Sequence, residues 1–289
     1  MRGIDHLVLP VTTLTLARAR MTSLGFTVAP HAHHRFGTGN CCVFFRNRSY
    51  LEPITVVDRS AADLAAAEGQ FFVRRIKRFT ESRGEGFAMV ALKSEDAERD
   101  RAAFEKAGIA AGPTFSFARQ ARLPDGSERE IGFAVAYAET PAAPLATFFA
   151  CQHLAPEVVF QPAYMEHRNG ALGVSAVTAV AASPNEFAAF LQNALDVSEL
   201  QPGDTGVEAS EEAQNVRIVT PDAFQDRYGV SPPDPRRGLR FAAFEIDVEN
   251  LDRAAPYCGK DAKREEARIV LPPSPGLGAV MVFQAAKNG

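Results

Sequence analysis

One succession of patterns occurs four times along the 289-residue chain, and this repetition limits the possible folds more than any other feature. In each copy an apolar, β-branched segment is followed by a segment with helical spacing and then by further strand-like segments. The repetition predicts four βαβββ units. Their first strands are expected at residues 3–11, 86–92, 174–181 and 239–248. In the first unit the further strands are expected at residues 26–29, 41–45 and 50–56, with a loop and turn between the first two of them.

Capping residues delimit the predicted helices. In the first unit Thr13 precedes a helical segment at residues 14–24 and Gly25 follows it, which is typical of a helix start and stop. Between the first two units, residues 59–83 predict an Ala-rich helix followed by a basic run at residues 74–78. This run is interpreted as a solvated helix face, with a phosphate or anion site as the alternative.

An amphipathic strand set cannot bury its apolar face alone. Two units side by side can curl into a half-open barrel whose inward side chains line a pocket, and four units make two such cups. The sequence thus predicts an α+β fold in which units one and two pair with each other, as do units three and four. The seam is expected near residues 167–173, which divides the chain into domains 1–169 and 170–289.

Composition narrows the classes of partner. Acids and bases are spread along the chain with a net charge of −4, so nucleic acid is not an expected partner. No apolar run approaches the roughly 18–20 residues that span a bilayer, and no secretory signal is recognisable, so a cytoplasmic protein without a membrane partner is expected. The four cysteines are interpreted as free thiols. Exposed sheet edges favour a homodimer.

Nucleotide and nucleophile motifs are missing from the sequence. It contains no G-x-x-x-x-G-K-[ST], no G-x-G-x-x-G and no G-x-S-x-G. The expected ligand is therefore a small molecule other than a nucleotide.

Several segments resemble a known family. Residues 3–8 (GIDHLV) and 50–52 (YLE), together with the unit order, are similar to the glyoxalase-like domain proteins of the vicinal oxygen chelate superfamily. The resemblance is strongest over residues 1–57 and 144–180. Three further segments contribute to it: residues 34–40 (HRFGTGN), 148–153 (FFACQH) and 166–171 (EHRNGA).

The resemblance implies a divalent metal held by a His on the first strand of a unit and a Glu on its last strand. His6 and Glu52 match these two positions. The second unit departs from the pattern, because residues 86–91 contain no His and residues 151–153 contain no Glu. The candidate metal ligands are therefore His6, Glu52 and His153. Two His and one carboxylate suit Fe(II), Mn, Zn or Ni with positions left for a chelating substrate.

The second cup is expected to be degenerate, since neither of its first strands contains a His. Each ligand candidate has an alternative interpretation. His6 could be a buried, hydrogen-bonded core residue. Glu52 needs a metal, a His or an Arg if it faces inward, and is a surface acid if it faces outward.

Four further residues are candidates for the site. His34 is a candidate general base beside Glu52, since its ordinary pKa lies near neutrality. Thr38 and Asn40 offer hydrogen bonds to a substrate, although Asn40 could instead pin a tight turn. His167, next to a turn, is a candidate for substrate binding or for holding the linker between the cups.

Two functions follow from these expectations. One is a metal-dependent lyase, isomerase or dioxygenase acting on a small substrate with adjacent oxygens. The other is a metal-free protein that sequesters a small aromatic or acyl ligand in a Phe-lined cup. One scaffold hosts many functions, so the fold alone does not separate them.

Overall fold

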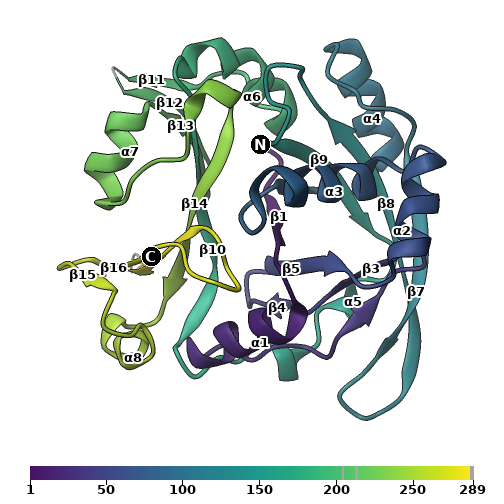
Figure 1. Ribbon diagram of the computed structural model, residues 1–289, viewed down its shortest axis with the longest axis horizontal. Coiled ribbons are helices and arrows are strands. Elements are labelled where there is room, and N and C mark those ends of the chain that lie inside the picture. The colour runs from purple at the N-terminus through teal and green to yellow at the C-terminus, as the bar shows by residue number, and fades with distance from the viewer. Residues whose placement is uncertain (204, 212–213, 287–289) are drawn as a thin grey trace.

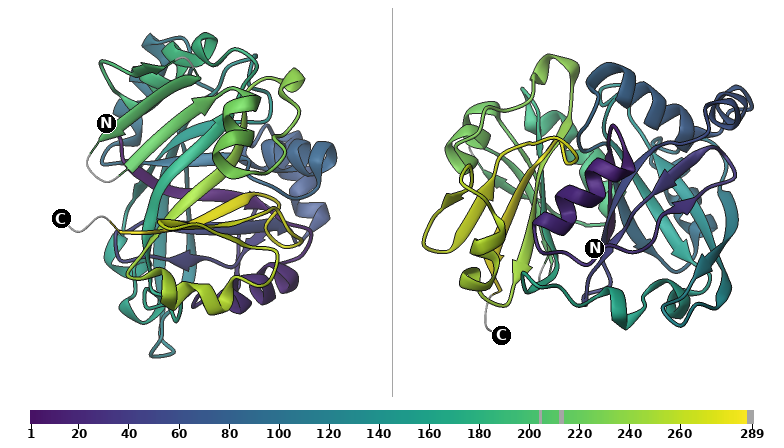
Figure 2. Two further views of the ribbon diagram at one scale, coloured as in Figure 1. Left: turned by 90° about the vertical axis from the view of Figure 1, so that its left-hand side faces the viewer. Right: turned by 60° about the horizontal axis from the view of Figure 1, so that its bottom comes forward.

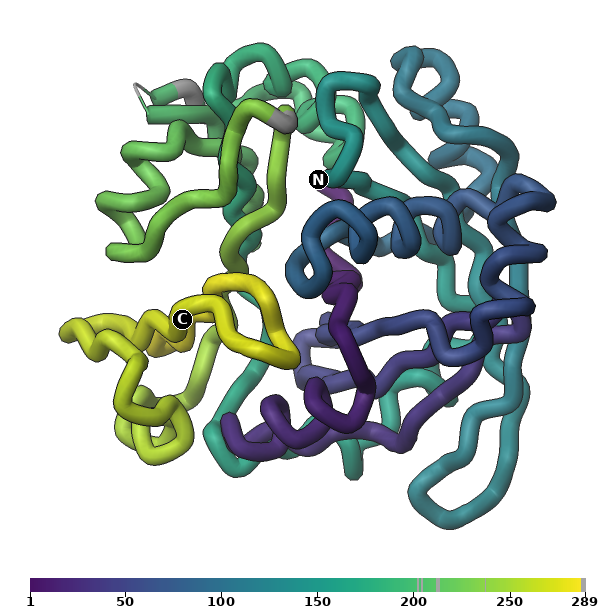
Figure 3. Tube along the Cα trace, in the orientation of Figure 1, coloured from purple at the N-terminus to yellow at the C-terminus, as the bar shows by residue number. Residues whose placement is uncertain are grey.

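The computed structural model describes residues 1–203, 205–211 and 214–286, and it has the predicted α+β architecture. Two sheets stand side by side, with the N-terminal half of the chain on the right of Figure 1 and the C-terminal half on the left. The tube in Figure 3 follows the same division, from purple and blue to green and yellow.

The first sheet contains nine strands in the described residues, in the order β2-β3-β5-β1-β6-β9-β8-β7, with β4 paired to β5. Its curvature is visible in Figure 2, and we call its concave side the first cup. The strands are β1 (Ile4–Pro10), β2 (Ala32–His33), β3 (Thr38–Asn40), β4 (Val43–Phe44), β5 (Tyr50–Val56), β6 (Met89–Ser94), β7 (Phe115–Arg122), β8 (Glu128–Ala138) and β9 (Thr147–His153).

The second sheet repeats the order of the first, position by position: β11-β12-β13-β10-β14-β17-β16-β15. We call its corresponding side the second cup. Its strands are β10 (Ala171–Val180), β11 (Gln201–Gly203), β12 (Gly206–Glu211), β13 (Gln214–Val219), β14 (Arg240–Val248), β15 (Lys263–Arg264), β16 (Arg268–Leu271) and β17 (Val280–Ala285).

The helices connect these strands and cover the outside of the molecule. They are α1 (Leu14–Ser23), α2 (Arg59–Ala67), α3 (Phe71–Arg83), α4 (Ala97–Lys106), α5 (Pro156–Val159), α6 (Ala188–Leu195), α7 (Pro221–Tyr228) and α8 (Leu251–Ala254). Short 3-10 turns lie at Pro162–Tyr164, Pro184–Phe187, Pro235–Arg237 and Ala255–Tyr257. No helix in the described part of the chain is long and apolar enough to cross a membrane.

The predicted pairing of units is confirmed. β1 pairs with β6 antiparallel, with His6 opposite Ala91, and β10 pairs with β14 in the same way, with Ala176 opposite Glu245. Within each unit the first strand also pairs in parallel with the last, as β1 does with β5. Four first strands therefore lie at the centres of the two sheets.

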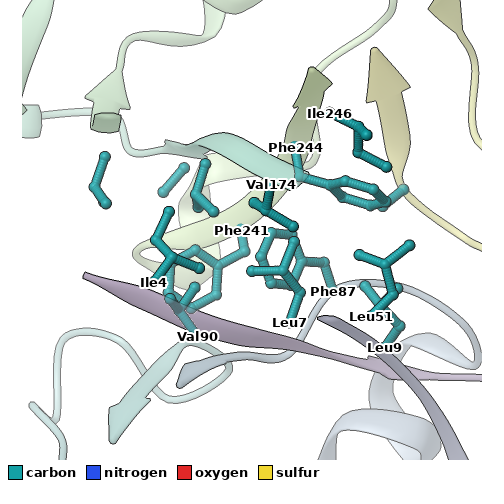
Figure 4. Close-up of a cluster of buried hydrophobic side chains, with 14 of the residues drawn as sticks. Ile4, Leu7, Leu9, Leu51, Phe87, Val90, Val174, Phe241, Phe244 and Ile246 are labelled. Carbon is teal, nitrogen blue, oxygen red and sulfur yellow. The ribbon is translucent and has the colours of Figure 1, made fainter. Parts of the chain in front are cut away.

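A shared apolar core joins the two sheets. Leu7 and Leu9 of β1 belong to the same buried cluster as Phe241 and Phe244 of β14, with Phe87 between them (Figure 4). Because alternate residues of a strand point to opposite faces, the other face of β1 is directed toward the first cup.

Three local expectations need correction. Residues 26–29 do not form a strand, whereas Ala32–His33 and Thr38–Asn40, expected in a loop, do. The helix α7 was not expected. The basic run on α3 is only partly solvated, because Arg75 is buried, donates a hydrogen bond to the carbonyl of Pro144 (2.7 Å) and pairs with Glu139.

Candidate functional site

A β-bulge in β1 shapes the base of the first cup. Ile4 lies opposite Leu92 and His6 opposite Ala91, so Asp5 is an extra residue on the β1 side. A bulge of this kind re-aims side chains locally. Ile4 consequently packs in the core between the sheets, while Asp5 and His6 both reach the groups of the cup.

Five side chains form a continuous chain of contacts at this base. His6 Nδ1 lies 2.6 Å from Asp5 Oδ1, and His153 Nε2 lies 3.0 Å from the same oxygen. The opposite ring nitrogen, His6 Nε2, lies 3.6 Å from Glu52 Oε2. Asn40 Nδ2 donates a hydrogen bond of 2.7 Å to Glu52 Oε1. The predicted match of His6 with Glu52 thus corresponds to a close pair, which we call the His6–Glu52 pair.

Burial and charge act differently on the two carboxyl groups. Burial disfavours ionised Asp5, but the charges and hydrogen bonds of His153 and His6 outweigh it and hold the pKa of Asp5 well below its usual range. For Glu52, burial dominates and raises the pKa, although His6, Asn40 and Arg119 partly offset it. Asp5 is therefore the fixed anion, and Glu52 is the carboxyl group that exchanges a proton more readily.

The His6–Glu52 pair lies at a cavity of about 510 Å³. The His6 ring stacks on Tyr50, with centroids 4.2 Å apart, and meets the edge of Phe149. Aromatic rings form much of the remaining wall, and the aromatic residues of the lining are Phe36, Phe44, Tyr50, Phe72, Phe117, Phe133, Tyr137, Phe149 and Tyr164. Charged residues also line it, namely Arg35, Glu52, Arg119, Arg122, Glu128 and Glu130. A cavity of this size that combines aromatic walls with placed polar groups is typical of a small-molecule site.

His34 lies in the cavity wall but is held in its neutral form. Its Nδ1 lies 2.8 Å from the hydroxyl of Thr38, and its ring stacks on Phe36. Burial, followed by the charges of Arg119 and His33, lowers the pKa of His34 to about 3. A group with so low a pKa is a weak base at neutral pH. Thr38 itself is fully buried and lies behind His34.

The structure separates two other predicted residues from the cavity lining. His167 uses both ring nitrogens within the protein, accepting from the Thr27 amide (3.1 Å) and donating to the Phe44 carbonyl (2.8 Å). Burial lowers its pKa to about 4. His153 contacts Asp5 through Nε2, and its Nδ1 is buried with no hydrogen-bond partner in the described residues.

Potential ligand atoms gather differently from the predicted set. In the described part of the chain, Asp5, Cys151 and His153 form a group whose ligand atoms all lie within 4.8 Å of one another. The cavity side instead presents His6 and Glu52, and His153 would have to leave Asp5 to join them.

Sequence reasoning missed two residues of this site. Asp5 was not expected at the site, because regular alternation would place it on the face of β1 opposite to His6. Arg119 lines the cavity from β7, and its only indication in the sequence was the alternation of Phe115, Phe117 and Arg119 along one predicted strand.

Comparisons with known proteins identify the family and the fold. The family model described as "Glyoxalase-like domain" matches residues 4–195, more than half of the chain. No curated protein sequence matches significantly.

Solved structures similar to this chain share its fold at low identity. A hypothetical protein from Staphylococcus aureus has a TM-score of 0.71 at 12% identity, covering 99% of this chain and 100% of that one. A triple mutant of 4-hydroxymandelate synthase from Streptomyces coelicolor has a TM-score of 0.56 at 13% identity, covering 100% and 94%. A fusion of a xylose isomerase-like TIM barrel with 4-hydroxyphenylpyruvate dioxygenase has a TM-score of 0.56 at 11% identity, covering 100% of this chain and 49% of that one.

The extent of the family match and the order of strands in both sheets lead to the same assignment. The chain belongs to the glyoxalase-like domain family.

Proposed function

We propose that the first cup binds a small organic molecule and acts on it with the help of a divalent cation held by His6 and Glu52. The observation that carries this proposal is the buried His6–Glu52 pair at the base of an aromatic cavity. The reaction class that fits it is that of a lyase, isomerase or dioxygenase on a substrate with adjacent oxygens. Zn, Mn, Ni or Fe(II) are the cations that a His and a carboxylate suit.

The surroundings of the pair support a metal-binding role. A metal-ligating His ordinarily donates its other ring N–H to a carboxylate, and ligating carboxylates are themselves hydrogen-bonded. His6 Nδ1 faces Asp5 at 2.6 Å, which leaves the Nε2 lone pair on the side of Glu52. Asn40 holds the other carboxylate oxygen of Glu52. These contacts orient two ligands toward one point.

The residues of the cup have separate tasks in this proposal. A divalent cation, when bound, polarises the adjacent oxygens of the substrate as a Lewis acid. Glu52 either holds the cation or takes up and returns a proton at its carboxylate oxygen. Asp5 keeps the proton of His6 on Nδ1 and stays ionised. The Phe-rich wall excludes water and packs against the apolar part of the substrate.

A metal-free binding protein is the second candidate, and a specific observation favours it. Opposite His6 the second unit has Ala91 on β6, and the neighbouring buried residues of β6 and β9 in the same cluster are Met89, Phe149 and Cys151. The second unit therefore offers no imidazole or carboxylate at these positions. A cup with two metal-ligating side chains in place of four would retain a small molecule through packing and hydrogen bonds alone.

Metal content distinguishes the two candidates. We expect tag-free protein to contain one of the four cations, and its melting temperature to rise when Mn, Ni, Zn or Fe(II) is added, because a ligand that binds only the folded state stabilises it. Glu52→Gln should abolish this rise. The double variant His31→Ala/His33→Ala is the matched control, since it removes two exposed imidazoles of the same cavity lining and should keep the rise.

A metal-dependent function is ruled out if the protein holds less than about a tenth of an equivalent of metal and shows no thermal shift with any of the four cations. The proposal also fails if the His31→Ala/His33→Ala variant loses the thermal shift and Glu52→Gln keeps it. The first result would leave the metal-free binding protein as the function of the cup.

A further inference from the structure

Arg119 lines the first cup from β7. Along β7 the residues alternate between half-buried and exposed, and Phe115, Phe117 and Arg119 share the half-buried face. Both Phe117 and Arg119 line the same cavity as Glu52. The guanidinium thus enters an otherwise aromatic part of the wall.

The guanidinium of Arg119 has almost no partner within the protein. Its hydrogen bond runs from NH1 to the carbonyl of the next residue, Gln120, at 3.4 Å, a weak contact. Its Nε is buried without any hydrogen-bond partner among the residues that the structure describes. Part of this half-buried guanidinium is therefore desolvated without a hydrogen bond or a salt bridge in the described residues, a cost that an anionic ligand would offset.

The charge of Arg119 nevertheless acts on two titratable groups of the cavity. Burial is the larger influence on the pKa of both His34 and Glu52, but Arg119 further lowers the pKa of His34 and opposes the rise at Glu52. Asp5, the ionised carboxylate of the base, is already shared between two histidines. Arg35 and Arg122 also line the cavity, but both are exposed, so Arg119 is the half-buried cationic partner for a negative charge that enters it.

The geometry of the guanidinium indicates which kind of anionic group fits beside it. The planar fork of an Arg matches two oxygens of a carboxylate and forms charge-assisted hydrogen bonds with them. The rings of Phe36, Phe117 and Phe133 lie beside it and offer an apolar surface. A ligand that satisfies both features has a carboxylate joined to an aromatic or acyl body.

We propose that Arg119 binds the carboxylate of the ligand, so that the first cup selects amphipathic organic acids over neutral molecules of the same shape. The body of the acid packs against the Phe wall, and its other oxygen-bearing group reaches the His6–Glu52 pair. This inference rests on the proposed function, because it names the substrate class of the same cavity.

Matched acids and amides test the assignment. Phenylacetate, 3-phenylpropionate and 4-phenylbutyrate are titrated calorimetrically into the full-length protein, each beside its primary amide. We expect at least one acid to bind about tenfold or more tightly than its amide, the difference that a hydrogen bond to a charged group provides. Arg119→Gln should remove this preference, and Arg119→Lys should keep part of it. Arg129→Gln, an exposed arginine of the same hairpin, should change nothing.

Each other outcome has a defined consequence. Equal affinity for acid and amide, or an unchanged preference in Arg119→Gln, overturns the assignment of Arg119 and leaves the cup as a binding site. Failure of every probe to bind also overturns it. The metal measurement on the His6–Glu52 pair then decides separately whether the proposed function stands, because Arg119 takes no part in holding the cation.

Discussion

Burial sets the charge state of individual histidines around the first cup. His34 is enclosed by aromatic rings and bonded to Thr38, and its pKa falls from 6.5 to about 3. His6 has the opposite surroundings, because its Nδ1 meets the ionised Asp5. Two imidazoles that look alike in the sequence therefore have different chemistry: one is a neutral part of the wall and the other is oriented for use.

The low pKa of His34 predicts acid sensitivity. Its pKa is lower in the folded state than in the unfolded state, so the unfolded chain binds more protons between about pH 3 and pH 6.5. The free energy of unfolding should fall as the pH decreases through this range, by about 2 kcal/mol from His34 between pH 7 and pH 5. Urea denaturation at the two pH values should show a smaller fall for His34→Gln than for the native chain. An equal fall in both would contradict the shift.

How far single residues could be predicted depended on the regularity of their strands. The pairing of His6 with Glu52 was implied by the resemblance of their strands to the glyoxalase-like family, and the register of these strands is regular from His6 onward. Asp5 could not be placed, because the bulge is caused by tertiary pairing with β6 and leaves no mark in the local pattern. Arg119 could not be placed either, because its position in the cavity wall depends on segments that are distant in the sequence.

The strands of the second sheet have different residues at the positions that form the site in the first sheet. The bulge recurs in β10, and the registers place Ser175, Ala176 and Arg217 where Asp5, His6 and Glu52 stand in the first sheet. Arg217 donates to Glu245 at 3.1 Å, and Tyr228 of α7 donates to the same carboxylate at 2.9 Å. A buried ion pair thus fills the base of the second cup.

Breaking this ion pair should cost stability. Glu245 is 3% exposed, and Arg217→Met leaves its carboxylate with less compensation, so the free energy of unfolding should fall by about 3 kcal/mol. The double variant Arg217→Met/Glu245→Leu should recover most of the loss, because an apolar pair of similar volume avoids the buried charge. Chemical denaturation measures both. A harmless single variant, or a double variant as unstable as the single one, would contradict a structural role.

Secondary structure was predictable where local chemistry decides it. The cap at Thr13, whose side chain accepts from the Leu16 amide, starts α1 as expected. The strand expected at residues 50–56 has those bounds. The short strands β2 and β3 were missed because each forms only by pairing at the edge of the sheet, beside β5. α7 was missed, although Thr220 caps it and Pro221 begins it.

For the whole molecule, repetition of one unit accounts for the architecture. The strands of the first sheet lie between Ile4 and His153 and those of the second between Ala171 and Ala285, while one apolar core joins both. The division at residues 169 and 170 stays a prediction. The first sheet keeps an open cavity with a histidine and a carboxylate at its base, and the second is closed by Arg217 and Glu245. We therefore propose one functional site, in the first cup, for a molecule built from two similar halves.

The proposed binding of the cation by His6 and Glu52 together can be tested at the level of single atoms. Protein with ¹⁵N-labelled histidine is titrated with Mn²⁺, and paramagnetic broadening of the imidazole nitrogens is followed by NMR, with His6→Gln used to assign the His6 signals. We predict that the His6 Nε2 signal broadens first and that Glu52→Gln prevents it. Broadening confined to His31 and His33, with His6 unchanged, would contradict the account.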